Sequence, residues 1–161
     1  MKSNKLRTDA YLNVKSQIGY CGIWCGSCVV GNGVLRKLTS EYEIVIKNYG
    51  LKEWAPRDFN YDEFMKGLTS IQIMEPCIGC MKGGGRDNCE IKACARSKKL
   101  KDCSECRDIK LCPNMKILEH MRSGAQVAGL FVKRRKENRS ALLKKWRKKL
   151  RNTWPCYILF R

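Results

Sequence analysis

Apolar residues recur at three- and four-residue steps in several stretches of the chain, which is the spacing of one face of an α-helix. The first such stretch runs from Val34 to Tyr49. A second starts after Asn60, with Glu63 three residues further on in the spacing of a capping box. The pattern therefore predicts two helices, joined by a segment in which Trp54 and Phe59 are expected to cover a small core.

Two further helices are predicted in the last third of the chain. Pro113 suits the first turn of a helix that continues through residues 115–121. A last helix is expected to open at Ser140 and to carry a narrow apolar stripe that ends at Leu150, with basic residues over the rest of its surface. The segment Trp154–Phe160 is too apolar to remain in water, so we expect it to fold back onto the body.

Between these helix pairs the chain has few apolar positions and many cysteines. Two CxxC pairs, Cys77/Cys80 and Cys103/Cys106, are separated by 22 residues. A CxxC pair on a tight turn directs two sulfurs at one point, and two such pairs complete a tetrahedral site of four thiolates. This segment is therefore predicted to be irregular and to be held together by metal rather than by an apolar core.

A third group of cysteines lies near the start, where Cys21, Cys25 and Cys28 have the spacing C-x₃-C-x₂-C. Radical S-adenosylmethionine enzymes hold a [4Fe–4S] cluster with this spacing. Those enzymes usually carry an aromatic residue before the third cysteine, where this chain has Ser27, and they need most of a (β/α) barrel of roughly 200 residues or more. We interpret the loop as a further group of metal ligands.

The cysteines are interpreted as metal ligands rather than as disulfide partners. No apolar run behind the N-terminus resembles a signal peptide, so a cytoplasmic protein is expected, and disulfides are rare in that reducing compartment. The ten candidate ligands are Cys21, Cys25, Cys28, Cys77, Cys80, Cys89, Cys94, Cys103, Cys106 and Cys112. The eleventh cysteine, Cys156, stands 44 residues beyond this series and is expected to bind no metal.

Ten thiolates do not divide evenly into sites of four. Two tetrahedral sites would leave two thiols over, whereas a binuclear site with shared thiolates can use a different number. We expect zinc as the cofactor, with about two ions per chain. The alternative is an iron–sulfur or redox protein that uses the Cys21/Cys25/Cys28 loop with a further cysteine such as Cys112.

Basic residues are concentrated at the C-terminal end. Residues 133–161 hold 12 Lys and Arg against one acidic residue, whereas residues 1–132 hold 21 against 14. This distribution predicts an acidic partner, either RNA or a ribonucleoprotein, with an anionic membrane surface as a less favoured competitor. The candidate nucleic-acid contacts are Lys133, Arg134, Arg135, Lys136, Arg139, Lys144, Lys145, Arg147, Lys148, Lys149 and Arg151.

No motif indicates a catalytic site or a small-molecule substrate. A zinc hydrolase needs an open coordination position and a general base, and no His-Glu or Glu-centred motif supplies them. The glycines at 83–85 do not form a phosphate-binding loop, because no Gly-Lys-Ser/Thr follows them. The one histidine, His120, is expected to be an exposed residue of the third helix.

The cysteines form five groups in a fixed order. These groups are Tyr20-Cys-Gly-x-x-Cys-Gly-x-Cys, Cys77-x-Gly-Cys, Cys89-x-Ile-x-x-Cys-Ala, Cys103-x-x-Cys and Cys112-Pro. From about Ile18 to Leu118 the chain therefore resembles DUF3795, a family of small, cysteine-rich prokaryotic proteins of unknown function. The resemblance implies zinc binding through the ten cysteines named above and assigns no activity.

These observations predict a small, mainly α-helical domain with little β-structure and an irregular, metal-stapled segment. Hydrophobic residues make up 43% of the 161 residues, which is enough for a folded core. We assign residues 1–132 to the cysteine-rich metal-binding domain. Residues 133–161 are assigned to a basic amphipathic helix followed by an apolar C-terminal tail.

Overall fold

The computed structural model describes residues 10–161. This part of the chain is helical and has two isolated β-bridges in place of a sheet. Its α-helices are α2 (Ala10–Val14), α3 (Val34–Asn48), α4 (Leu51–Trp54), α5 (Tyr61–Ile73), α6 (Glu90–Ser97), α7 (Met115–Val127) and α8 (Arg139–Leu150). Short 3₁₀ turns are η1 (Cys25–Ser27), η2 (Cys80–Lys82), η3 (Cys103–Glu105), η4 (Ile109–Leu111) and η5 (Cys156–Phe160). The predicted mainly helical domain is confirmed.

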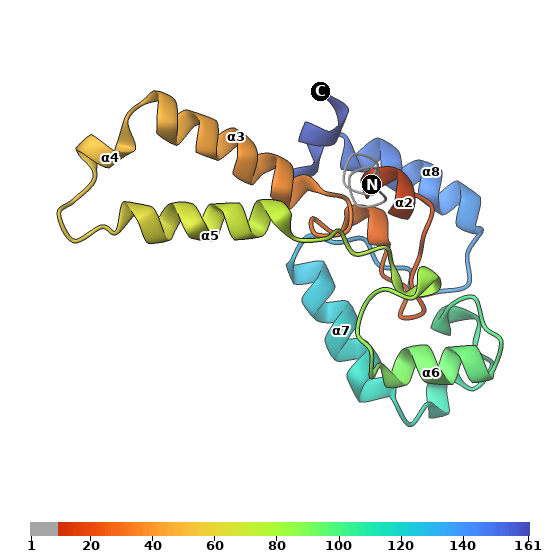
Figure 1. Ribbon diagram of the computed structural model, residues 1–161. Coiled ribbons are helices and arrows are strands. Elements are labelled where there is room, and N and C mark those ends of the chain that lie inside the picture. Colours follow the sequence, from red (N-terminus) through yellow and green to blue (C-terminus); the bar gives the residue numbers. More distant parts are fainter. Residues whose placement is uncertain (1–9) are drawn as a thin grey trace.

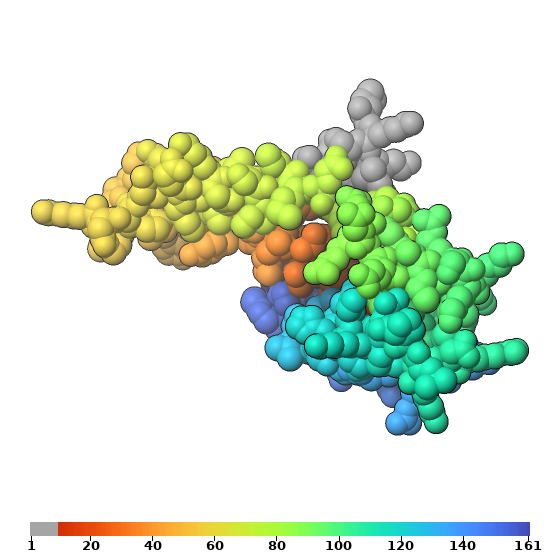
Figure 2. All heavy atoms as spheres, turned by 90° about the horizontal axis from the view of Figure 1, so that it is seen from below, coloured from red at the N-terminus to blue at the C-terminus, as the bar shows by residue number. Residues whose placement is uncertain are grey.

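The molecule consists of a body and a projecting arm. Helices α3 and α5 lie side by side along the arm, with α4 at its far end, and the same arm extends from the body in the turned view (Figures 1 and 2). Helices α2 and α8 lie on one side of the body, and α6 and α7 lie on the other (Figure 1). The cysteine-rich loops run between these two sides.

Side-chain caps set the starts of two predicted helices. The Asn60 side chain accepts a hydrogen bond from the Glu63 N–H at 3.0 Å, and α5 begins at the next residue. Helix α8 begins one residue before Ser140, because Asn138 is its cap and accepts from the Ala141 N–H at 2.9 Å. Helix α7 begins two residues after Pro113, at Met115.

The main core joins the two ends of the chain. The ring of Trp24, which is fully buried, stacks on Trp146 of α8 at a centroid distance of 5.9 Å. Phe131 completes the group at 5.8 Å from each of these two rings. The other buried members of this core are Ile18, Val34, Leu143, Leu150, Cys156 and Ile158. The basic helix and the apolar tail are therefore integral parts of the folded body.

A second core lies beneath the cysteine-rich segment, whose 3₁₀ turns are irregular as predicted and which also contains one helix that was not predicted. Helix α6 runs through it, and its residues Ile91 and Ala95, one turn apart, are buried against Leu118 of α7. The Cys89 sulfur caps α6 by accepting the Lys92 N–H at 3.5 Å. A short helix thus forms here because two apolar positions share one face and a sulfur satisfies its first turn.

Of the two aromatic residues expected to cover a core, Trp54 is exposed, whereas Phe59 packs on Phe64 of α5 at a centroid distance of 5.3 Å. The exposed fractions of Tyr49 and Trp54 are 80% and 83%. Neither residue belongs to either core cluster, and the arm that carries them projects from the body (Figure 1). The apolar spacing of this segment reflects the packing of α3 on α5, which leaves part of each helix surface exposed.

The ring stack predicts unequal effects of two tryptophan substitutions. Trp146→Ala should lower the free energy of unfolding by about 3–5 kcal/mol, because it removes a buried ring that contacts both Trp24 and Phe131. Trp154→Ala is the matched control, since Trp154 is 69% exposed, and its cost should be about 1 kcal/mol or less. Urea denaturation measures both values, and equal costs would contradict the assignment of α8 to the core.

Candidate metal centre

The ten candidate ligands separate into two groups in space. One group lines a single cavity of about 270 Å³ and consists of Cys21, Cys25, Cys28, Cys77, Cys80 and Cys89. The other group is carried by α6 and the turns η3 and η4, and consists of Cys94, Cys103, Cys106 and Cys112. We call them the six-cysteine cavity and the four-cysteine group. All eleven cysteines of the chain are free thiols.

Trp24 fixes the loop that carries the first three cysteines. Its indole N–H donates to the Lys15 carbonyl at 3.0 Å, and the Cys25 N–H donates to the Gln17 carbonyl at 2.9 Å. The chain then passes over the indole ring at Gly26, where a Cβ atom would lie 2.6 Å from the ring. Only glycine fits at this position, so η1 and its cysteines are held against the main core.

The Cys77/Cys80 loop docks on the same part of the chain. The Gln17 side-chain amide donates to the Ile78 carbonyl at 2.8 Å, and the Tyr20 N–H donates to the Cys80 sulfur at 3.4 Å. Gly79 has a φ of +84°, and a Cβ atom there would lie 2.3 Å from the Gln17 side-chain oxygen. These contacts bring residues about 60 positions apart to one wall of the cavity.

The two groups are neighbours, because the Cys103 N–H donates to the Tyr20 carbonyl at 2.8 Å. In the four-cysteine group, the Cys106 N–H donates to the Cys103 carbonyl at 3.2 Å and closes the CxxC turn. The Lys98 ammonium lies 3.8 Å from the Cys106 sulfur. Cys103 interacts electrostatically with Cys112 and Cys94 of this group, and more strongly with Cys21 of the six-cysteine cavity.

Burial strongly raises the pKa of one thiol in each group, Cys25 and Cys103. It raises the pKa of Cys25 to about 12, and the neighbouring thiols, with Cys80 first, shift this pKa further upward. Burial also raises the pKa of Cys103 to about 12, against an opposing effect of Arg122. Such thiols stay protonated at neutral pH unless a cation stabilises the thiolates, so metal binding would release protons.

The donor set fits a thiophilic metal, although the thiols are not gathered as a ready-made cage for one ion. In residues 10–161, no three Cys, His, Asp or Glu side chains lie close enough together to hold a single ion without adjustment. His120 is exposed on α7, as expected. Sulfur is therefore the only donor type that both groups offer, which matches the preference of zinc and of iron–sulfur clusters.

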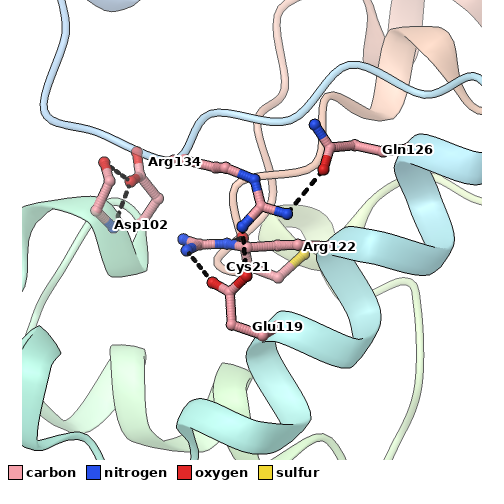
Figure 3. Close-up of polar contacts among 7 residues, drawn as sticks. Cys21, Asp102, Glu119, Arg122, Gln126 and Arg134 are labelled. Carbon is pink, nitrogen blue, oxygen red and sulfur yellow. Dashed lines mark hydrogen bonds and ion pairs between the residues drawn. The ribbon is translucent and has the colours of Figure 1, made fainter.

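Arg122 of α7 lies beside the loop of Cys21 (Figure 3). The side chain is 3% exposed, its Nε donates to the Cys21 carbonyl at 2.8 Å, and its Nη1 pairs with Glu119 at 3.2 Å. Its buried Nη2 has no hydrogen-bond partner in the described part of the chain. The guanidinium charge lowers the pKa of Cys103. A buried cation thus faces the region where the two cysteine groups meet.

Lys133, one of the predicted nucleic-acid contacts, lies inside the protein rather than at the surface. Its ammonium pairs with the Asp102 carboxylate at 2.8 Å, and their side-chain exposures are 1% and 0%. Arg139 approaches the same carboxylate at 3.5 Å. The sequence places Lys133 in an exposed basic run, but a buried acid next to Cys103 requires a cation, and Lys133 supplies it.

The other tail cations divide between internal contacts and free surface. Arg134 pairs with Glu119 and donates to Gln126 at 2.7 Å (Figure 3), and Arg147 donates to the Ser16 hydroxyl at 2.8 Å. Besides Arg134, whose side chain is both exposed and paired, the exposed tail cations are Arg135, Lys136, Lys144, Lys145, Lys148, Lys149 and Arg151.

A family model described as "Protein of unknown function (DUF3795)" matches residues 17–117. The match covers more than half of the chain and includes both cysteine groups. The chain belongs to the DUF3795 family. No curated protein and no solved structure shows significant similarity to it. Helix α8 lies outside the DUF3795 region, so the family match contains the cysteine groups but not the helix that completes their main core.

Several features of this site could not be predicted from the sequence. Neither the six-and-four division nor the pairing of Asp102 with Lys133 follows from residue spacing, because both depend on contacts between distant segments. Arg122 carries no sequence signal beyond its place in an amphipathic helix. No helix in the described part of the chain combines the length and apolar character needed to span a membrane.

Removing the buried cation should destabilise the protein. Lys133→Met leaves Asp102 buried beside only the more distant Arg139, so the free energy of unfolding should fall by about 3–5 kcal/mol. The double variant with Asp102→Asn, which keeps an oxygen to accept from Ser104, should recover much of this loss. Urea denaturation of these variants and of Asp102→Asn alone gives the coupling free energy between Asp102 and Lys133. Lys136→Met, at an exposed position, is the control. Additive effects of the two substitutions would contradict a buried ion pair.

Proposed function

We propose that the protein is a cytoplasmic metal–thiolate protein with two metal centres. The observation that carries this proposal is that six of the eleven cysteines line one cavity, while Cys103 interacts electrostatically with Cys94 and Cys112. The four-cysteine group supplies the number of thiolates that a tetrahedral zinc site uses. We assign one zinc ion to it, and a second thiolate-bound centre to the six-cysteine cavity.

The surrounding charges support this assignment. A zinc ion with four thiolates has a formal charge of −2, which a buried site must offset. Arg122 contributes a buried positive charge with an unpartnered N–H group, and Lys98 lies within 3.8 Å of the Cys106 sulfur. The eleven free thiols agree with a reducing compartment. Metal would also supply folding energy to loops that have little apolar core.

The two centres should lose metal independently. Cys106→Ser should remove about one zinc ion per chain, because it deletes one of four thiolates in that group. Cys25→Ser should reduce the metal content of the other centre and leave this zinc in place. Metal analysis of protein purified without oxygen measures both losses.

Cys156→Ala is the matched control for these cysteine variants. Cys156 is buried in the main core next to Asn32. It does not line the six-cysteine cavity and is not one of the four-cysteine group, so its substitution should leave the metal content unchanged. Wild-type protein that contains no metal and has disulfides between these cysteines would contradict the proposal. Equal metal loss from all three variants would contradict the division into two centres.

A second proposed function is RNA binding through α8. The supporting observation is that Lys144, Lys145 and Lys148 are exposed on this helix, and that no acidic residue follows Glu137. A surface of this kind attracts phosphates through charge and releases their counterions, with little dependence on sequence. An anionic membrane is disfavoured as the partner, because the apolar stripe of α8 is buried in the core.

Neutralising these lysines should weaken RNA binding without unfolding the protein. Lys144→Gln, Lys145→Gln and Lys148→Gln together should reduce the slope of log affinity against log salt by about 2, at about 0.7 per phosphate for single strands. The matched control replaces three exposed arm cations, Lys52, Arg57 and Lys66, by Gln. Equal slopes for both triple variants would reject α8 as the contact. Binding to anionic vesicles alone would favour a membrane.

A further inference from the structure

The six-cysteine cavity is larger than a single metal ion requires. A zinc ion lies about 2.3 Å from each thiolate, so its four sulfurs are about 3.8 Å apart and leave no space between them. Here the six cysteines are among the residues that line a cavity of about 270 Å³. No three of them lie close enough together for one ion, a statement that covers residues 10–161. A group that fills this space must bring atoms of its own between the sulfurs.

The walls of the cavity leave room for such a group. Glycines stand beside the thiols at positions 19, 31, 79 and 85. At Gly19 a Cβ atom would lie 3.1 Å from the Cys80 sulfur, and at Gly31 it would lie 3.3 Å from the Cys77 carbonyl oxygen. Larger residues at these two positions would press against the cavity wall, so glycine keeps the backbone close to the thiols.

Backbone N–H groups already point at two of the sulfurs. The Tyr20 N–H donates to Cys80 at 3.4 Å, and the Lys92 N–H donates to Cys89 at 3.5 Å. Hydrogen bonds of this kind stabilise thiolate charge and tune iron–sulfur clusters. The Lys92 and Arg86 side chains also line the cavity and add positive charge. The lining thus offers sulfur ligands, N–H donors and cations together.

We propose that the six-cysteine cavity holds an iron–sulfur cluster, an assignment that rests on the proposed metal–thiolate function. The inorganic sulfides of a cluster provide the atoms that a zinc ion lacks, and four thiolates complete its coordination. Cys21, Cys25 and Cys80 are proposed as the centre of the ligand set, because all three line the cavity and Cys80 interacts electrostatically with both of the other two. The fourth thiolate comes from the other three cysteines of the cavity.

Two spare thiols follow from this assignment. A cluster with four thiolate ligands leaves two of the six cysteines without a metal bond. Cys28, Cys77 and Cys89 supply one ligand between them, so substitution of any one of these should be tolerated better than substitution of Cys25 or Cys80. This gradation distinguishes a cluster from a binuclear zinc site, in which all six thiolates bind metal.

The test uses the full chain, purified without oxygen and also reconstituted with ferrous iron, sulfide and a thiol reductant. The expected result is about four iron and four acid-labile sulfide per chain, with brown colour and a Mössbauer spectrum of a cluster. Cys106→Ser should keep the iron and lose zinc. Cys25→Ser and Cys80→Ser should lose the iron and keep zinc, and zinc retention shows that these variants still fold.

Other outcomes separate this inference from the proposed function. Zinc alone, at about three ions per chain and without uptake of iron or sulfide, would overturn the cluster and leave the metal–thiolate function standing. Iron retained by both Cys25→Ser and Cys80→Ser would overturn the placement in this cavity. Protein that binds neither metal would overturn both proposals.

Discussion

The stacking of Trp24 on Trp146 is the contact on which the rest of the structure depends. It joins the first cysteine loop to the basic helix α8, although 122 positions separate the two rings in the sequence. Because the loop bends over the indole at Gly26, the positions of η1 and its cysteines follow from where the ring lies. The six-cysteine cavity is therefore built partly by a segment outside the family match.

Sulfur burial imposes the second constraint. A thiolate without a cation is unfavourable at these positions, as the raised pKa of Cys25 and of Cys103 indicates, and burial is the main cause in both cases. In the protonated form the buried thiols carry no charge, so the fold accommodates them without a cation. A metal ion would replace the protons and offset the charge of the resulting thiolates. Arg122 opposes the effect of burial on the pKa of Cys103, and the Tyr20 N–H and the Lys92 side chain oppose it at Cys80.

The helices were predictable because their signals are local. The apolar spacing from Val34 and the Asn60 cap lie within the segments that they organise, and α3 and α5 formed where these signals indicated. The features that could not be predicted from the sequence depend on contacts between distant segments. The exposed run that contains Lys133 gives no sign of a buried partner, and the apolar spacing around Trp54 gives no sign that an arm would carry it away from the core.

The Asp102 ion pair connects the two regions that sequence analysis treated separately. Asp102 precedes Cys103 and caps η3 by accepting the Ser104 N–H at 2.9 Å, while its other oxygen holds Lys133 at the start of the basic segment. Arg139, the first residue of α8, lies 3.5 Å from the same carboxylate. One buried carboxylate thus joins the turn that carries Cys103 to the start of the basic helix. The tail cations accordingly differ in their surroundings: Lys133 and Arg139 pair with a buried carboxylate, whereas Lys144, Lys145 and Lys148 of α8 are exposed.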